Sequence, residues 1–108
     1  MTTYTAFLDE IDATSIARVG GKGANLGELL KAALPVPKAF CVTTDAYRDF
    51  IAAHDLQNRI LAALNNLNYD DVVELERRAS YIRKLIETAD MPADIAVAIH
   101  EAYGRLEV

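Results

Sequence analysis

One short stretch of the chain combines residue types that bind phosphate. Within residues 18–30, RVGGKGANLGELL, three glycines surround a lysine and an asparagine follows: Gly20, Gly21, Lys22, Gly23 and Asn25. Glycine reaches φ values above zero and lets a ligand approach the backbone, and consecutive N–H groups form an anion-binding nest. Lys22 adds a compact cation, and Asn25 hydrogen-bonds the ligand or caps a helix. These residues predict a contact with phosphate.

Two familiar phosphate-binding patterns are absent from this stretch. A P-loop needs GxxxxGK[ST], but Ile16 replaces its first glycine and Gly23 its serine or threonine. A dinucleotide-binding fingerprint needs GxGxxG, and the spacing from Gly21 is one residue too long. The alternative is an ordinary turn before a helix. In that helix Gly27 costs roughly 1 kcal/mol relative to alanine, so we expect it to permit a close approach.

The elements around the glycines follow from apolar spacing. We expect a short strand at residues 3–8 and a helix at 24–34. The buried stripe of this helix comprises Leu26, Leu29, Leu30, Ala33 and Leu34. Pro35 and Pro37 then end the helix, because proline cannot donate to its hydrogen bonds. A second strand is expected in AFCVT, at residues 39–43.

The rest of the chain has helical periodicity. Thr43, Thr44 and Asp45 supply capping oxygens for a helix in which Tyr47 and Phe50 have the spacing of core residues. Three more apolar patterns cover residues 60–67, 72–86 and 95–106. The sequence therefore predicts a small α+β fold, rich in helix, with two short strands and about five helices in a single domain over residues 1–108.

Composition excludes several classes of protein. The chain has 108 residues and a net charge of -5, which disfavours binding to nucleic acid or to an anionic membrane. Cys41 is the only cysteine, so no intrachain disulfide forms and a structural zinc site is disfavoured. The start of the chain has no secretory signal pattern, and no apolar run is long enough to span a membrane. We therefore expect a cytoplasmic protein.

The segment VGGKGANLGELL, followed by LPVPKAFCVTTDAYRDFI, resembles the amino-terminal segment of the phosphoenolpyruvate-utilising phosphotransferases. That family includes phosphoenolpyruvate synthase, pyruvate phosphate dikinase and rifampicin phosphotransferase. The resemblance implies the opening part of an ATP-grasp nucleotide-binding domain, in which Lys22 contacts ATP phosphates and Gly20, Gly21 and Gly23 shape the loop. It further implies ATP-dependent phosphoryl transfer through a phosphohistidine, with Mg²⁺ required.

The match to the family pattern is incomplete. The family usually has a glycine before LPVP and Pro-Gly before the phenylalanine, where this chain has Ala33, Lys38 and Ala39. The family's VRSSA-like strand, acidic magnesium ligands and phosphohistidine domain are not found in the 108 residues. His54 and His100 lack the family's Ser-His context, so we assign no catalytic residue. Because the family's acidic magnesium ligands are not among these residues, we assign no metal ligand. We expect the chain to be the front part of a longer protein whose other domains bind the small-molecule phosphate acceptor.

Three interpretations of function remain open. The first is the ATP-binding part of a phosphoenolpyruvate synthase or pyruvate phosphate dikinase-like enzyme, inactive in isolation. The second is the corresponding part of a rifampicin phosphotransferase. The third is a non-catalytic helical binding module, which a natural stop codon after residue 108 would favour. The charged segment at residues 74–84 is read as a solvated helix face with paired charges rather than as a partner-binding helix.

Overall fold

The computed structural model describes residues 3–106. Its two strands and five α-helices confirm the predicted small, helix-rich α+β fold. The chain divides into two compact units, Met1–Asp49 with Pro92–Val108, and Phe50–Met91. We call them the first and the second unit and describe each by itself. The assignment of the whole chain to one domain stays a prediction.

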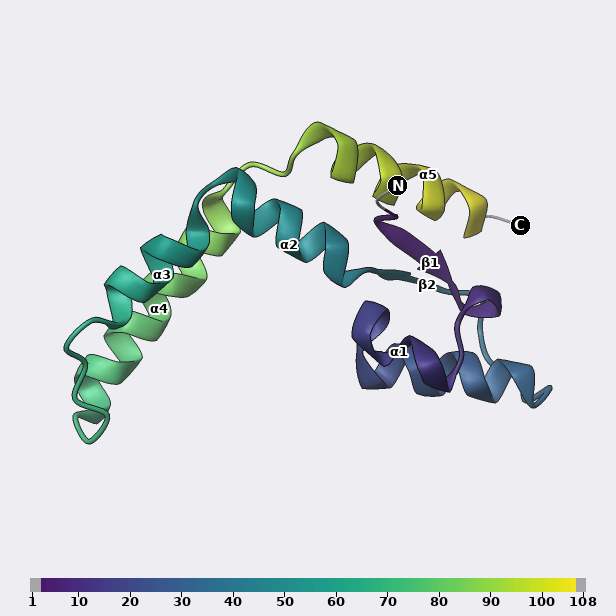
Figure 1. The fold of residues 1–108 in the computed structure, drawn as a ribbon, viewed down its shortest axis with the longest axis horizontal. Coiled ribbons are helices and arrows are strands. Elements are labelled where there is room, and N and C mark those ends of the chain that lie inside the picture. The colour runs from purple at the N-terminus through teal and green to yellow at the C-terminus, as the bar shows by residue number, and fades with distance from the viewer. Residues whose placement is uncertain (1–2, 107–108) are drawn as a thin grey trace. The chain divides into compact units, whose positions relative to one another are not determined.

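The first unit is built on a two-stranded antiparallel sheet, β1 (Thr5–Phe7) and β2 (Phe40–Val42). Ala6 of β1 is opposite Cys41 of β2 in the pairing register. Figure 1 shows helices on either side of this sheet. The helical elements of the unit are η1 (Leu8–Glu10), η2 (Ala13–Ser15), α1 (Ile16–Lys31), α5 (Ala93–Leu106) and the beginning of α2 (Thr44–Ala53).

The core of the first unit lies where β1 and η1 meet α1. Ala6, Leu8 and Ile11 are buried and are covered by partly buried apolar side chains of α1 and β2. Polar contacts tie neighbouring elements to β1. The Tyr4 hydroxyl donates to Asp49 Oδ2 at 2.7 Å and lies 3.2 Å from Asp94 Oδ2. The hydrogen bond to Asp49 raises the pKa of Tyr4. A two-stranded sheet is marginal alone, so this covering by helices is what stabilises it.

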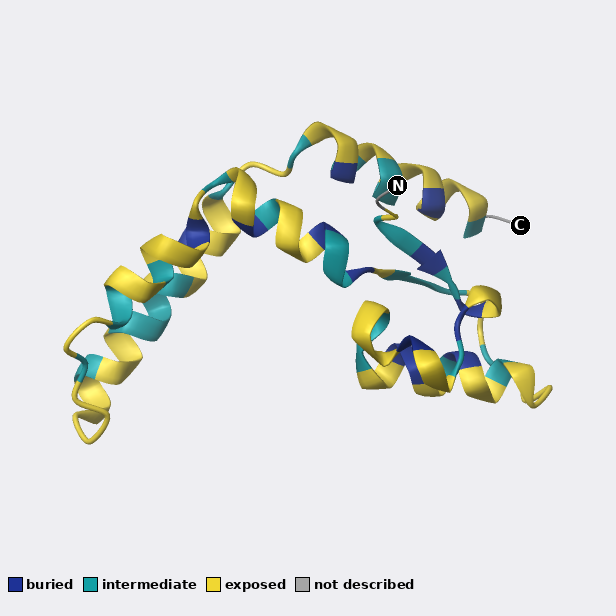
Figure 2. Ribbon diagram, viewed as in Figure 1, coloured by how far each residue is buried: buried dark blue, intermediate teal, exposed yellow. Residues whose placement is uncertain are grey.

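The second unit is a pair of helices, α3 (Leu56–Leu64) and α4 (Val72–Thr88), which lie side by side and pack on the end of α2 (Figure 1). Its core residues are Ile51, Leu56 and Leu85. Figure 2 shows how small the buried part of these helices is compared with their exposed surface. The unit is held together by a narrow apolar seam.

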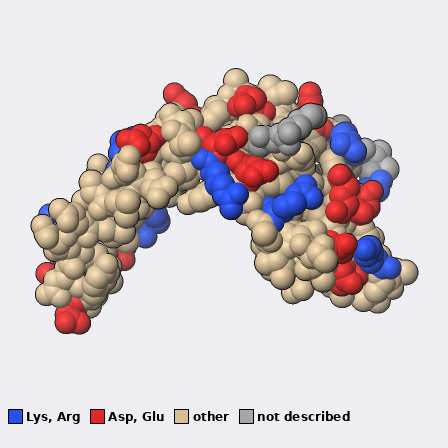
Figure 3. Space-filling model, viewed as in Figure 1, with Lys and Arg blue, Asp and Glu red and all other residues tan. Residues whose placement is uncertain are grey.

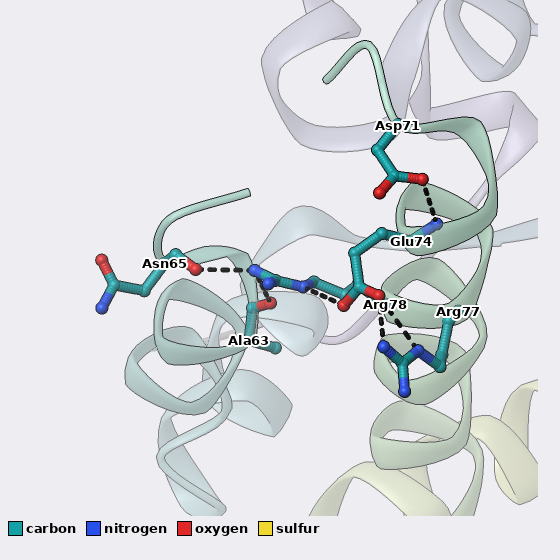
Figure 4. Close-up of polar contacts among 6 residues, drawn as sticks. All are labelled: Ala63, Asn65, Asp71, Glu74, Arg77 and Arg78. Atoms are coloured by element: carbon teal, nitrogen blue, oxygen red, sulfur yellow. Dashed lines mark hydrogen bonds and ion pairs between the residues drawn. The ribbon is translucent and has the colours of Figure 1, made fainter. Parts of the chain in front are cut away.

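Charged side chains of α4 pair with one another and with the end of α3 (Figure 4). Glu74 accepts hydrogen bonds from Arg77 and from Arg78 Nε, the latter at 2.9 Å. Arg78 Nη1 also donates to the carbonyl oxygen of Asn65 at 2.6 Å, just after α3. The hydrogen bonds from Arg77 and Arg78 lower the pKa of Glu74. These i,i+3 and i,i+4 pairs confirm the interpretation of this segment as a helix face with paired charges.

Several details of the predicted elements are wrong. The helix predicted over residues 24–34 corresponds to the second piece of α1, a helix that begins at Ile16, breaks at Gly20 and ends at Lys31. Ala33 follows it with a left-handed φ of 62°. In the predicted apolar stripe, Leu26 and Leu30 pack against the core, whereas Leu29 is 42% exposed and Leu34, which follows the end of α1, is 48% exposed. Tyr47 is 61% exposed and is therefore not a core residue.

Candidate functional site

The glycine-rich segment forms a break within α1 rather than an open loop before a helix. Gly20 has φ 80° and ψ 172°, and the helix continues on both sides of it. Only glycine adopts such a backbone conformation without strain. Gly21, Lys22 and Gly23 thus belong to the start of the second helical piece. The predicted open loop over Gly20 to Gly23 is wrong in this respect, although the positive φ at Gly20 is present.

The first turn of α1 is fixed by a contact from α2. The Thr44 hydroxyl donates to the carbonyl oxygen of Ala17 at 2.9 Å. This bond secures the helical turn that precedes the break at Gly20. Sequence analysis assigned Thr44 only to capping α2, and nothing in the spacing of residues 17 and 44 indicates the contact. Thr44 is therefore a supporting residue of the site that sequence reasoning missed.

One face of the second piece packs very closely against the rest of the unit. An added Cβ at Gly23 would lie 2.9 Å from Cys41 Sγ, and one at Gly27 would lie 2.4 Å from the carbonyl oxygen of Ile11. Both glycines are buried, as is Ala24. The expectation that Gly27 permits a close approach is confirmed. The glycine spacing of i, i+4 places β2 and the residues before η2 directly against the helix backbone.

The opposite face of the same piece is open. Gly21, Lys22 and Asn25 are exposed, and an added Cβ at Gly20 or Gly21 would meet no atom within 4 Å. Lys22 forms no ion pair or side-chain hydrogen bond within residues 3–106. On the face of the molecule in Figure 3, basic side chains lie scattered among acidic ones. Of the five predicted phosphate-binding residues, three share the exposed face, Gly20 lies at the break, and Gly23 faces inward.

The far end of α1 is anchored by acidic side chains. Asp12 caps η2 by accepting from the Thr14 amide at 2.8 Å, and it pairs with Lys31 Nζ at 3.1 Å. The hydrogen bonds from Thr14, with that from Lys31, lower the pKa of Asp12 to about 2. Glu28 Oε2 accepts from the Ala13 amide at 2.8 Å. These contacts hold α1 in register with the residues that its glycines pack against.

The reactive side chains of Cys41 and His54 make contacts that support the fold. Burial raises the pKa of the Cys41 thiol, which lies against Gly23. His54, in the turn after α2, hydrogen-bonds the carbonyl oxygen of Asp90 and lies edge-on to Phe50. Within residues 3–106 no three His, Cys, Asp or Glu side chains are grouped to hold a metal ion. No helix in this range is long and apolar enough to cross a membrane.

Comparison with known proteins bears on the residues of α1. Residues 16–108 match the family described as pyruvate phosphate dikinase, AMP/ATP-binding domain. A protein named "Probable phosphoenolpyruvate synthase" from Methanocaldococcus jannaschii is 48% identical over 103 residues, which are 95% of this chain and 9% of that protein. The phosphoenolpyruvate synthase of Pseudomonas aeruginosa is 37% identical over 98% of this chain and 14% of its own length.

A relative with a different name matches almost as much of the chain. The rifampicin phosphotransferase of Streptomyces sviceus is 40% identical over 103 residues, which are 94% of this chain and 12% of that protein. The chain therefore spans between 9% and 14% of the length of these three curated relatives. The family match covers α1 and everything after it, so it includes both faces of the glycine-containing helix.

Proposed function

The chain belongs to the pyruvate phosphate dikinase, AMP/ATP-binding domain family, and on that premise we propose that the exposed face of α1 binds the phosphate groups of ATP. The observation that carries the proposal is the position of Lys22. It is exposed and without an ion-pair partner within residues 3–106, and it stands next to the break at Gly20. This is where a helix presents backbone donors and the positive end of its dipole to an anion.

Each proposed binding residue has a separate task. Gly20 supplies the turn that begins the second helical piece, and Gly21 leaves its backbone accessible to the ligand. Lys22 places a cation beside the phosphates, where it stabilises negative charge. Asn25 is on the same exposed face and donates a side-chain hydrogen bond. Gly23 contributes its backbone amide only, because its α-carbon faces Cys41.

We propose that magnesium enters this site with the nucleotide. The described residues contain no group of side chains suited to hold a metal ion by themselves. Mg²⁺ bound to ATP neutralises part of the phosphate charge, and Lys22 then supplies a further positive contact. An ATP-grasp architecture for the complete nucleotide domain and a cytoplasmic location remain predictions from the sequence.

The parent activity that we propose is ATP-dependent phosphoryl transfer in a phosphoenolpyruvate synthase or pyruvate phosphate dikinase-like enzyme. The names of two relatives support it. Because the chain is also 40% identical to a rifampicin phosphotransferase, the alternative is that the parent is an enzyme of that kind. A small-molecule acceptor would bind to parts of the parent outside this chain. The third interpretation, a non-catalytic helical module, predicts no nucleotide binding at all.

The first test measures the affinity of the chain for Mg-ATP. Binding is monitored through the ³¹P signals of the nucleotide. We expect weak binding by the 108-residue chain, with a dissociation constant in the millimolar range. Lys22→Gln is expected to weaken it about tenfold, which is the usual magnitude for losing one charged hydrogen bond. Lys84→Gln, which removes the same charge from α4, is the matched control. Equal affinity of Lys22→Gln and the wild type would contradict the proposal.

Turnover gives an independent test. Because the groups that would complete phosphoryl transfer are not among the described residues, we expect negligible ATP hydrolysis by the chain alone. The measurement is phosphate release from Mg-ATP by a clean preparation. Robust hydrolysis that disappears in Lys22→Ala would overturn this expectation and assign catalysis to the chain itself.

A further inference from the structure

The first unit contains a cavity of about 310 Å³ that does not involve the proposed phosphate-binding residues. It lies between the end of β1, residues 36–39 and the last turn of α5, with Leu30 contributing from α1. Its apolar walls include Phe7, Val36 and Leu106. The volume is at the lower end of the range for sites that bind small molecules, which are typically apolar with a few charged or polar groups.

Three charged side chains line this cavity: Asp9, Lys38 and Arg105. None of them forms an ion pair or a side-chain hydrogen bond within residues 3–106. The two cations therefore outnumber the carboxylate by one, in a chain whose overall charge is -5. The positive excess is local to the cavity, and no partner among the described residues neutralises it.

The position of Arg105 suits it to bind a carboxylate. Its guanidinium carbon lies 4.3 Å from the centroid of the Phe7 ring. A guanidinium in cation–π contact with a ring still has five N–H donors in all, more than the ring can engage, so donors remain for a ligand. Phe7 is in turn supported by Phe40, whose ring centroid is 5.7 Å away. The aromatic pair thus holds one cation at the edge of an apolar cavity.

We propose that this cavity binds a small organic anion, namely a carboxylate with an aromatic or branched aliphatic body. The apolar walls would cover the body, and Arg105 and Lys38 would neutralise the carboxylate. Charge complementarity favours this class over a neutral ligand, which would gain no ion pair from the two exposed cations. It also favours a monoanion over a zwitterion, because the lining has two cations and only one carboxylate, Asp9, to pair with a positive group of the ligand.

The test uses 3-phenylpropanoate as the probe and its uncharged amide, 3-phenylpropanamide, as the control ligand. Both are titrated into the full chain while amide chemical shifts are recorded. We expect shifts at Phe7, Leu8, Ala39 and Leu106, and about tenfold tighter binding of the carboxylate than of the amide. Arg105→Gln is expected to weaken the carboxylate about tenfold. Arg48→Gln, which removes the same charge at an exposed pair with Asp45, should bind as the wild type does.

Each other outcome overturns the proposal. Absence of shifts at the cavity up to about 10 mM probe, or equal affinity for carboxylate and amide, would remove the anion site. If Arg105→Gln fails to fold, Lys38→Gln in the exposed loop is the second variant, and unchanged affinity there would count against the proposal. Phenylalanine bound more tightly than 3-phenylpropanoate, and weakened by Asp9→Asn, would instead assign a zwitterionic ligand.

Discussion

The two pairs of glycines in α1 have opposite surroundings. Gly20 and Gly21 face open space, whereas Gly23 and Gly27 are in contact with Cys41 and with the backbone of Ile11. Glycine therefore leaves the backbone accessible to solvent in one pair and allows close packing in the other. Glycine enrichment alone does not identify a ligand site, because the packed pair would be needed even in a protein without a ligand. Only the open pair and Lys22 support the nucleotide proposal.

The largest effect is expected for Gly27→Ala. Its new Cβ would lie 2.4 Å from the carbonyl oxygen of Ile11, a backbone atom that cannot move aside cheaply. We expect the free energy of unfolding to fall by about 3 kcal/mol, the upper part of the usual range for overpacking. Urea unfolding measures it.

Gly23→Ala is the matched control for the packed pair. Its Cβ would meet the end of a side chain, Cys41 Sγ, at 2.9 Å, so the loss should be smaller. A Gly27→Ala variant with wild-type stability would show that α1 does not pack as described, and the distinction between the two pairs would then fail.

A smaller change, of the opposite sign, is expected for Gly21→Ala. No atom lies within 4 Å of the added Cβ, and alanine favours a helix over glycine by about 0.5–1 kcal/mol. The variant should therefore unfold at a higher urea concentration than the wild type. Its affinity for Mg-ATP should nevertheless fall, because the methyl group occupies space that the ligand approaches. Unchanged affinity would mean that Gly21 is not kept open for a nucleotide.

The smallest effect concerns the contribution of Asp12 to stability as a function of pH. The pKa of Asp12 is about 2 in the folded chain against an ordinary value of 3.8, chiefly because Thr14 donates to it. A lowered pKa means that the carboxylate stabilises the fold above about pH 4 and that this stabilisation is lost as the pH falls toward 2. The melting temperature of Asp12→Asn should thus vary less than that of the wild type over this range.

Asp70→Asn is the control for this pH dependence. Asp70 lies in the second unit, and its carboxylate accepts no hydrogen bond from any other described residue. Its melting profile between pH 4 and pH 2 should follow that of the wild type. If the melting profile of Asp12→Asn also follows that of the wild type, the contacts of Asp12 with Thr14 and Lys31 do not anchor α1 in solution.

Sequence reasoning predicted the elements whose signals are local. Helical periodicity located the three later helices, although α3 is Leu56–Leu64 rather than residues 60–67, and β-prone runs located both strands. The role of Gly27 was also predictable, because a glycine in a helix interior has a cost that a close contact explains. These conclusions needed only neighbouring residues.

The wrong predictions depend on contacts between distant residues. The turn before Gly20 is helical and is bonded to Thr44, which lies 27 positions away from Ala17 in the chain. The inward face of Gly23 depends on Cys41 in β2. The inward side of α1 consists of Gly23, Ala24 and Gly27 with Leu26 and Leu30, and Leu29 lies outside it and is 42% exposed. The exposure of Lys22 agrees with the predicted site, whereas its contact with a nucleotide remains a proposal.

The most direct test of the distinction between the two glycine pairs is a titration of the wild-type chain with Mg-ATP. The amide chemical shifts of the chain are the readout. We predict shifts that cluster on residues 20–25, from Gly20 to Asn25, with none at Ile11 or Cys41, which face the packed side. Shifts at Ile11 and Cys41 without shifts at Lys22, or no shifts at millimolar nucleotide, would contradict the assignment of the open face of α1 to phosphate binding.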